Sequence, residues 1–216
     1  MFIEFFIIKK RILSLLKDRF KDSDIILDIG CGDKPYYHKS INAKIICADI
    51  KHNKKSKIVC DVMNLPFKKN KFDGVICINS LYYYSDPFKS IKEFSYILKK
   101  NGKLIIITPF IYPVHDAPID KYRFTEYGMR ELLKDYFTVK EIKTIGGIFN
   151  LPSIFLHSLI KGLPLIVPTQ IKKITKFLTI ITLYPFYIVA QLISLFDILD
   201  KSGRWATYYF VVAIKN

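Results

Sequence analysis

Short apolar runs, each bounded by polar or turn-forming residues, follow one another through most of the chain. The runs are nearly continuous in Ile and Val, which is typical of strands buried on both faces of a parallel sheet. We predict strands over residues 25–29, 44–50, 58–60, 72–78, 104–108, 137–145 and 207–214. Asp86-Pro87 opens a helix that Asn101-Gly102 ends, and a second helix starts near Thr125. This alternation predicts an α/β fold with a doubly wound sheet.

Two segments depart from this rhythm. Apolar positions at helical spacing predict an amphipathic helix over residues 3–20, which either covers a sheet edge or lies on a membrane surface. Residues 144–160 and 177–196 carry no formal charge and lie between the last two predicted strands. We expect a hydrophobic helical insertion there, acting as a shallow membrane hairpin, as a lid or dimer contact, or as two spanning helices. The expected organisation is an N-terminal helix (1–22), a core domain (23–144 and 205–216) and the insertion (145–204).

The chain is both rich in hydrophobic residues and strongly basic. The chain has 216 residues, 50% of them hydrophobic, and a formal net charge of +15, so a full core is possible and disorder is excluded. The basic excess consists of 29 Lys and only 5 Arg, whereas nucleic-acid binders rely on Arg for bidentate contacts. We therefore expect no nucleic-acid partner and expect contact with an anionic membrane surface.

The cysteines do not have metal-ligand spacing. Cys31, Cys47, Cys60 and Cys77 contain no C-x-x-C pair, and all lie in or beside apolar runs, where Cys acts as a small hydrophobe. We expect no metal site and a reducing, cytoplasmic location, with the protein peripheral or monotopic on the membrane.

A glycine-rich turn follows the first predicted strand. The run Asp28–Gly32 (DIGCG) lets the backbone approach a ligand closely at the carboxyl edge of the sheet. A dinucleotide fingerprint needs a further glycine where this chain has Pro35. The carboxylate of Asp28 would also repel a pyrophosphate, so the turn favours a cationic or amino-bearing ligand.

This turn resembles motif I of class I S-adenosylmethionine-dependent methyltransferases, type-11 branch, although Lys34 stands at the family's third glycine. Asp49 ends the second strand, where the family places an acid on the ribose hydroxyls, and Asp61 opens a D-x-x-x-L-P-F segment that meets the adenine amino group. The resemblance covers roughly residues 22–145. It implies S-adenosylmethionine as cofactor and a Rossmann-like, seven-stranded, mostly parallel sheet with an antiparallel terminal hairpin. The cofactor-binding residues that it implies are Asp28, Gly30, Cys31, Gly32, Asp49, Ile50, Asp61, Val62 and Asn79.

Simpler roles stay open for the three acids. Asp28 and Asp49 would then only cap strand ends, and Asp61 would only be a turn residue. Asn79-Ser80 stands where many family members carry a Glu-His pair.

Polar residues after the fifth predicted strand are candidates for acceptor chemistry. Residues 109–125 resemble a loop of methyltransferases from polysaccharide and cell-envelope contexts. His115 is the candidate general base, because its ordinary pKa lies near neutrality, and Asp116 or Asp120 would orient it. The candidate acceptor-binding residues are Tyr82, Asp120 and Arg123. Alternatively, Asp120 and Arg123 form a salt bridge that only fixes the loop, and His115 is structural. The other histidines, without a partner pattern, are His38, His52 and His157.

We therefore expect methyl transfer to a hydroxyl of a small-molecule, glycan or lipid-linked acceptor at the membrane surface. The alternatives are a quinone or lipid C- or O-methyltransferase, and a non-catalytic membrane-associated scaffold with the same fold. The sequence does not predict the oligomeric state.

Overall fold

The computed structural model describes residues 6–33, 35–52, 54 and 58–216. These residues form two compact units. The sheet unit is built from residues 11–110, 114–143 and 208–216, and the helical unit consists mainly of Thr144–Thr207. Each unit is described by itself.

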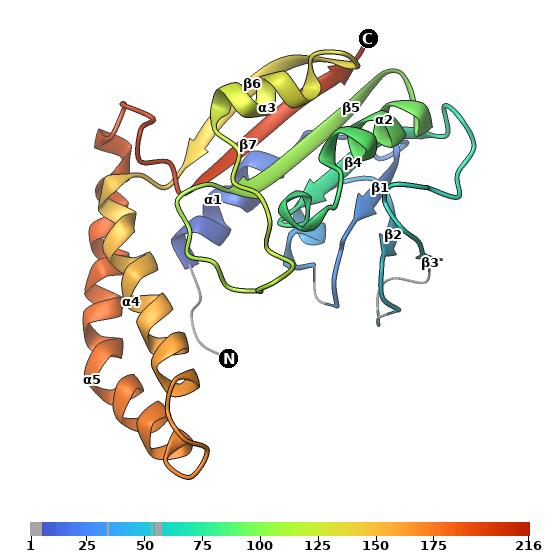
Figure 1. The fold of residues 1–216 in the computed structure, drawn as a ribbon. Coiled ribbons are helices and arrows are strands. Elements are labelled where there is room, and N and C mark those ends of the chain that lie inside the picture. The colour runs from blue at the N-terminus through green and yellow to red at the C-terminus, as the bar shows by residue number, and fades with distance from the viewer. Residues whose placement is uncertain (1–5, 34, 53, 55–57) are drawn as a thin grey trace. The chain divides into compact units, whose positions relative to one another are not determined.

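A single mixed sheet of seven strands, in the order β3-β2-β1-β4-β5-β7-β6, organises the sheet unit (Figure 1). The strands are β1 (Ile25–Ile29), β2 (Lys44–Asp49), β3 (Ile58–Val59), β4 (Phe72–Ile78), β5 (Leu98–Pro109), β6 (Phe137–Ile145) and β7 (Tyr208–Lys215). Strands β1 to β5 pair in parallel, whereas β7 runs antiparallel to β5. This arrangement confirms the predicted Rossmann-like fold.

The central strands are buried on both faces. Ile26 in β1, Val75 in β4 and Ile105 in β5 have no exposed surface. Two covered faces leave no solvent side that would require alternating polar residues, which explains the continuous apolar runs.

Two helices of the sheet unit begin at capping side chains. Helix α2 (Pro87–Ile97) follows Asp86, whose Oδ1 accepts a hydrogen bond from the Lys89 N–H at 2.9 Å. Helix α3 (Glu126–Leu133) follows Thr125, whose hydroxyl accepts a first-turn N–H at 3.0 Å. Each cap satisfies a backbone donor that the helix leaves unpaired. Figure 1 shows both helices on one face of the sheet.

Strand β5 begins six residues before its predicted start. Helix α2 ends at Ile97, and Leu98 already pairs with Phe72 of β4. Lys99 donates to Asp73 at 2.7 Å, and Asn101 takes a left-handed φ of +61°. The predicted turn is therefore absorbed into the strand.

The first helix buries one stripe of side chains. Helix α1 runs over Phe6–Leu16, while its predicted start at residue 3 lies outside the described residues. Ile12 is 1% exposed and Leu16 is fully buried. These two positions belong to the protein core.

The helical unit contains an antiparallel helical hairpin (Figure 1). Its elements are α4 (Leu151–Gly162), the 3-10 helix η4 (Leu163–Leu165), α5 (Lys172–Ile193) and the 3-10 helix η5 (Ser194–Leu199). Two stretches, Ile148–Leu165 and Lys172–Leu199, are long and apolar enough to cross a membrane by length and composition alone. Only 28% of the apolar window in each is buried. The predicted apolar insertion before the last strand is therefore confirmed.

Candidate functional site

A cavity of about 300 Å³ lies in the sheet unit where β1, β2 and β4 end. Carboxyl ends of parallel strands are where sheets of this type bind ligands. Six of the predicted cofactor-binding residues line the cavity: Gly30, Asp49, Ile50, Asp61, Val62 and Asn79. The other three, Asp28, Cys31 and Gly32, do not line it.

The backbone at Gly30, called the glycine cradle below, packs closely against the loop after β4. Its φ is +70°, and its N–H donates to Ala48 O at 2.8 Å. A Cβ at this position would lie 2.5 Å from Ser80 Cβ. The Ser80 hydroxyl is fixed in turn by donating to Ile29 O at 3.0 Å. Only glycine fits here without moving the wall of the cavity.

Two carboxylates in the cavity are held by backbone donors. Asp49 accepts from the N–H groups of Gly32 at 3.0 Å and Lys51 at 3.2 Å. Asp61 accepts from the Met63 N–H at 2.9 Å. Each carboxylate retains further acceptor capacity for the hydroxyl or amino groups of a ligand.

Asn79 presents an unsatisfied acceptor to the cavity. Its φ is +54°, and its N–H donates to Ile107 O at 2.8 Å. Its buried side-chain Oδ1 has no hydrogen-bond partner among the described residues. A buried unpaired acceptor costs about 1–3 kcal/mol, so a ligand that donates to Oδ1 binds favourably. The cavity therefore offers a glycine cradle, two anchored carboxylates and a free acceptor.

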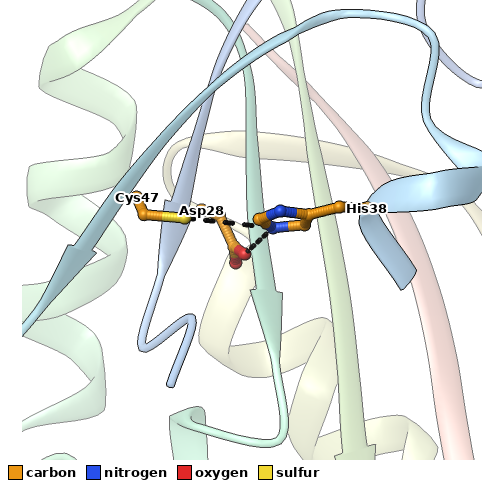
Figure 2. Close-up of side chains that lie close together, drawn as sticks. All are labelled: Asp28, His38 and Cys47. Atoms are coloured by element: carbon orange, nitrogen blue, oxygen red, sulfur yellow. Dashed lines mark hydrogen bonds and ion pairs between the residues drawn. The ribbon is translucent and has the colours of Figure 1, made fainter. Parts of the chain in front are cut away.

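Asp28, which does not line the cavity, lies in a polar cluster with His38 and Cys47 (Figure 2). Its carboxylate is fully buried, accepts from the Tyr37 hydroxyl at 3.0 Å and lies 2.6 Å from His38 Nε2. The sequence shows no partner pattern for His38 and favours an incidental role, whereas the structure pairs it with Asp28. His38 lies on a short 3-10 helix, η1 (Tyr36–Ser40), that follows Pro35, whereas Asp28 lies on β1.

Burial and pairing shift the pKa values of both Asp28 and His38. Burial raises the pKa of Asp28 to about 6, although the hydrogen bond from His38 opposes the rise. Burial lowers the pKa of His38, but the hydrogen bonds and charges of Asp28 and Cys47 together outweigh that effect and raise it to about 9. Near neutral pH the pair is therefore a carboxylate facing an imidazolium.

The same cluster contains donors of the kinds that bind zinc. Asp28 O, His38 Nε2 and Cys47 Sγ lie within 4.8 Å of one another (Figure 2). Two ligands about 2.0 Å from one tetrahedral zinc lie about 3.3 Å apart, farther than the 2.6 Å between Nε2 and Oδ2. The present geometry is that of a direct ion pair, and a metal would have to separate it. The absence of a metal site stays a prediction.

His115 lies in a second polar cluster of the sheet unit. Asp120 Oδ2 is 3.1 Å from His115 Nδ1 and accepts from its backbone N–H at 3.2 Å. The Asp120 side chain is fully buried and takes two hydrogen bonds from Arg123, at 2.5 and 2.8 Å. These bonds hold the pKa of Asp120 below its ordinary value, so Asp120 stays ionised. This is the salt bridge considered as the alternative role for Asp120 and Arg123.

Tyr83 connects this cluster to the cavity. Its hydroxyl donates to Asp116, accepts from Tyr82 at 3.0 Å and lies 3.3 Å from His115 Nε2. The Tyr82 hydroxyl is also 3.3 Å from this nitrogen. Tyr83 lines the cavity, whereas His115 does not. Burial raises the pKa of Tyr83 to about 12, so its phenol is protonated near neutral pH.

The sequence prediction omitted Tyr83. It lies only four residues after Asn79, in the 3-10 helix η2 (Leu81–Tyr83), but among three consecutive tyrosines the prediction chose its neighbour Tyr82. The structure brings together His115, Asp116, Asp120, Arg123 and Tyr82. Their catalytic and acceptor-binding roles stay predictions.

Comparisons with known proteins agree with this geometry. Residues 27–106 match a family profile described as a methyltransferase domain. An uncharacterised protein of Methanocaldococcus jannaschii is 31% identical over 156 residues, which are 66% of this chain and 67% of that one. A tRNA U34 carboxymethyltransferase of Campylobacter fetus is 34% identical over 113 residues, 44% of this chain and 38% of the relative. The chain thus spans little more than a third of that relative's length.

Solved structures share the fold. The [4+2]-cyclase SpnF has a TM-score of 0.63 and 17% identity, covering 95% of this chain and 80% of its own. A methyltransferase in complex with the Trm112 methyltransferase activator of Haloferax volcanii has a TM-score of 0.59 and 18% identity, covering 95% and 88%.

These comparisons correct one prediction. The expectation of no nucleic-acid partner, based on the scarcity of Arg, is contradicted by relatives named as a tRNA U34 carboxymethyltransferase and a probable tRNA methyltransferase. The scarcity of Arg in this chain is therefore no basis for excluding RNA.

The glycine cradle and the anchored acids fit S-adenosylmethionine, since its ribose and adenine groups can donate to carboxylates and its ammonium can donate to Asn79. The matched domain covers the strands that supply these residues. The chain therefore belongs to the class I S-adenosylmethionine-dependent methyltransferases, and S-adenosylmethionine is its cofactor.

Proposed function

We propose that this enzyme methylates a hydroxyl group, with His115 as the general base. The observation that carries the proposal is the linked set Asp120–His115–Tyr83. Asp120 contacts one ring nitrogen of His115, and the other nitrogen faces Tyr83, which lines the cofactor cavity. An ionised carboxylate holds one side of this base, and the Tyr82 and Tyr83 hydroxyls and Asp116 lie 3.3 Å from the nitrogen on the other side. Such an arrangement suits proton removal from an alcohol.

Bound S-adenosylmethionine supplies a methyl group on an activated sulfonium. Asp120 holds the Nδ1–H tautomer of His115, which leaves Nε2 as the proton acceptor. The proton of the acceptor hydroxyl passes to Nε2. Tyr82 and Tyr83 border the place of that hydroxyl, because their phenol oxygens lie 3.3 Å from Nε2. Their raised pKa values keep both phenols protonated.

We place the enzyme on an anionic membrane surface, with a lipid-linked or glycan acceptor. The helical unit exposes large apolar side chains, including Phe177 (63% exposed), Leu178 (54%) and Ile181 (55%). Large apolar side chains exposed together on one unit are typical of membrane or protein contact sites. Residues 144–196 also contain four Lys and no Asp or Glu. This combination favours an interfacial hairpin beside anionic head groups.

RNA is a second candidate acceptor. The relatives named as tRNA methyltransferases share the cofactor-binding part of the chain, and the net charge of +15 would attract a polyanion. This candidate would place the modified hydroxyl or base of an RNA in front of the same cavity.

A transfer assay separates the candidates. The full chain is incubated with S-adenosylmethionine labelled in its methyl group and with total membrane lipid or total RNA. Label in the lipid fraction, lost in His115→Ala but kept in the exposed control His52→Ala, is the expected result. Label in RNA instead would replace the lipid acceptor with the second candidate. Label in lipid that His115→Ala leaves unchanged would remove His115 as base.

A further inference from the structure

The helical unit contains its own cavity, a cleft of about 280 Å³ between α4 and α5. This volume lies near the lower end of small-molecule sites, which span roughly 300–1,000 Å³. It is separate from the cofactor cavity, because the two share no lining residue.

Lysines gather at one end of the cleft. Lys172 and Lys176 are one turn apart on the same face of α5, and Lys161 lies in the last turn of α4. Lys172 and Lys176 form no ion pair within the part of the chain that the structure describes, and residues 144–196 contain no Asp or Glu. This end therefore favours an anion.

Aromatic and aliphatic side chains form the rest of the cleft. His157 (8% exposed) and Tyr187 (3% exposed) pack with ring centroids 5.9 Å apart, and Tyr184 packs on Tyr187 at the same separation. Eight residues separate Lys176 from Tyr184, a rise of about 12 Å along the helix. The apolar walls are Ile160, Pro164, Leu165 and Ile180. A cationic end followed by an apolar floor matches an anionic amphiphile.

We propose that this cleft binds the phosphate head group and the first carbons of the chain of an anionic lipid. The inference rests on the proposed location of the helical unit at a membrane surface and gives that contact a defined binding site. The lysine ammoniums receive the phosphate, while the chain lies between Ile180 and Tyr184. Diffuse attraction to a charged bilayer would need no such cleft, which makes the two kinds of binding separable.

Titration calorimetry of the full chain with monomeric dihexanoyl phosphatidic acid tests the site without a bilayer. We expect saturable binding of one lipid per chain. Inorganic phosphate is expected to bind much more weakly because it lacks acyl chains. Dihexanoyl phosphatidylcholine is also expected to bind much more weakly because its net charge is zero. Equal affinity for inorganic phosphate would reduce the cleft to a plain anion site and overturn the lipid proposal.

Variants locate the bound lipid. The double variant Lys172→Ala with Lys176→Ala should weaken lipid binding about 30-fold. Each charge removed should account for a loss of affinity of about tenfold or less. Lys173→Ala is the matched control, because Lys173 has the same charge on the same helix but does not line the cleft. Ile180→Trp should block the apolar part without changing charge. Equal losses in Lys172→Ala and Lys173→Ala would show diffuse electrostatics and overturn the site.

Vesicle flotation keeps this failure distinct from failure of the membrane proposal. A chain that floats with phosphatidic-acid vesicles but shows no saturable binding of monomeric lipid would overturn the cleft and leave membrane contact standing. A chain that binds monomeric lipid but does not float would retain the cleft and overturn membrane residence.

Discussion

Asp28, at the start of the glycine-rich turn, and His38, in η1 after that turn, form a 2.6 Å ion pair. The carboxylate has no exposed surface, whereas the imidazole side chain is 21% exposed. A buried carboxylate is costly unless it is paired and hydrogen-bonded. His38, with Tyr37, therefore allows Asp28 to be ionised inside the protein.

This pair predicts a fall in stability at alkaline pH. The folded pKa of His38, about 9, lies above its unfolded value near 6.5. Its contribution is therefore full below pH 6.5 and is lost as the pH rises through about 9. Asp28 has the same sign, since its raised pKa makes stability fall between about pH 4 and 6. Thermal melts of wild type and His38→Gln should differ most near pH 6 and converge above pH 9. A difference that is constant from pH 6 to 10 would contradict the ion pair.

Gly30→Ala should destabilise the chain more than Gly32→Ala. Both glycines have positive φ, so each substitution costs about 1–2 kcal/mol of backbone strain. Only the new Cβ at position 30 meets Ser80, at 2.5 Å, while position 32 has open space. Overpacking should add about 1–3 kcal/mol at position 30. Urea denaturation of both variants measures the difference, and equal losses would rule out the close approach to Ser80.

Asn79→Gly should weaken cofactor binding without unfolding the protein. Glycine accepts the φ of +54°, and the substitution removes an acceptor that the described residues leave unpaired. We expect about a tenfold loss of affinity for S-adenosylmethionine by calorimetry. The free energy of unfolding should stay within about 1 kcal/mol of wild type. Unchanged affinity would mean that the Oδ1 does not contact the cofactor.

Asp120→Asn should reduce kcat much more than Asp116→Asn. Asp120 contacts His115 Nδ1 and is buried, while Asp116 contacts the Nε2 side and its side chain is half exposed. Loss of the orienting carboxylate should lower kcat by about 10²–10⁴-fold, the range of general-base catalysis. The KM for S-adenosylmethionine should not change, because Asp120 does not line the cavity. Equal effects of the two variants would assign the orienting role to neither acid alone.

Polar substitutions on the exposed face of α5 should release the protein from membranes. The double variant Phe177→Ser with Ile181→Ser removes two exposed apolar side chains one turn apart. Flotation with anionic vesicles should fall by about tenfold or more, while the melting temperature stays unchanged. Tyr127→Ser is the matched control, since Tyr127 is 81% exposed on α3 of the sheet unit. If the control loses as much flotation, the contact does not lie on the hairpin.

The sequence predicted the frame of the sheet because burial on both faces leaves a local mark. Strands β1, β4 and β6 begin and end where the apolar runs predicted. The caps Asp86 and Thr125 are equally local, because each bonds within one helical turn. The start of β5 was missed because Lys99 and Asn101 look like a turn until Asp73 of the neighbouring strand is placed beside them.

The site was predicted where the backbone supplies the chemistry and missed where side chains meet. Gly30, Asp49 and Asp61 follow strand ends, and parallel strands bring those ends to one edge. The pairing of His38 with Asp28 depends on how a short 3-10 helix turns back over β1, and no spacing rule encodes that turn. Tyr83 likewise joins His115 across 32 residues of sequence.

A hydrogen bond joins the two ends of the insertion. The Thr207 hydroxyl donates to Ile145 O at 2.7 Å, although 62 positions separate them along the chain. Loop-closure entropy grows slowly, by about 0.6 kcal/mol for each doubling of length. A change in the length of the segment between Ile145 and Thr207 therefore has little effect on the loop-closure part of the free energy of folding. A different insertion at this position could therefore direct the enzyme to another surface or partner, while the residues that bind the methyl donor stay the same.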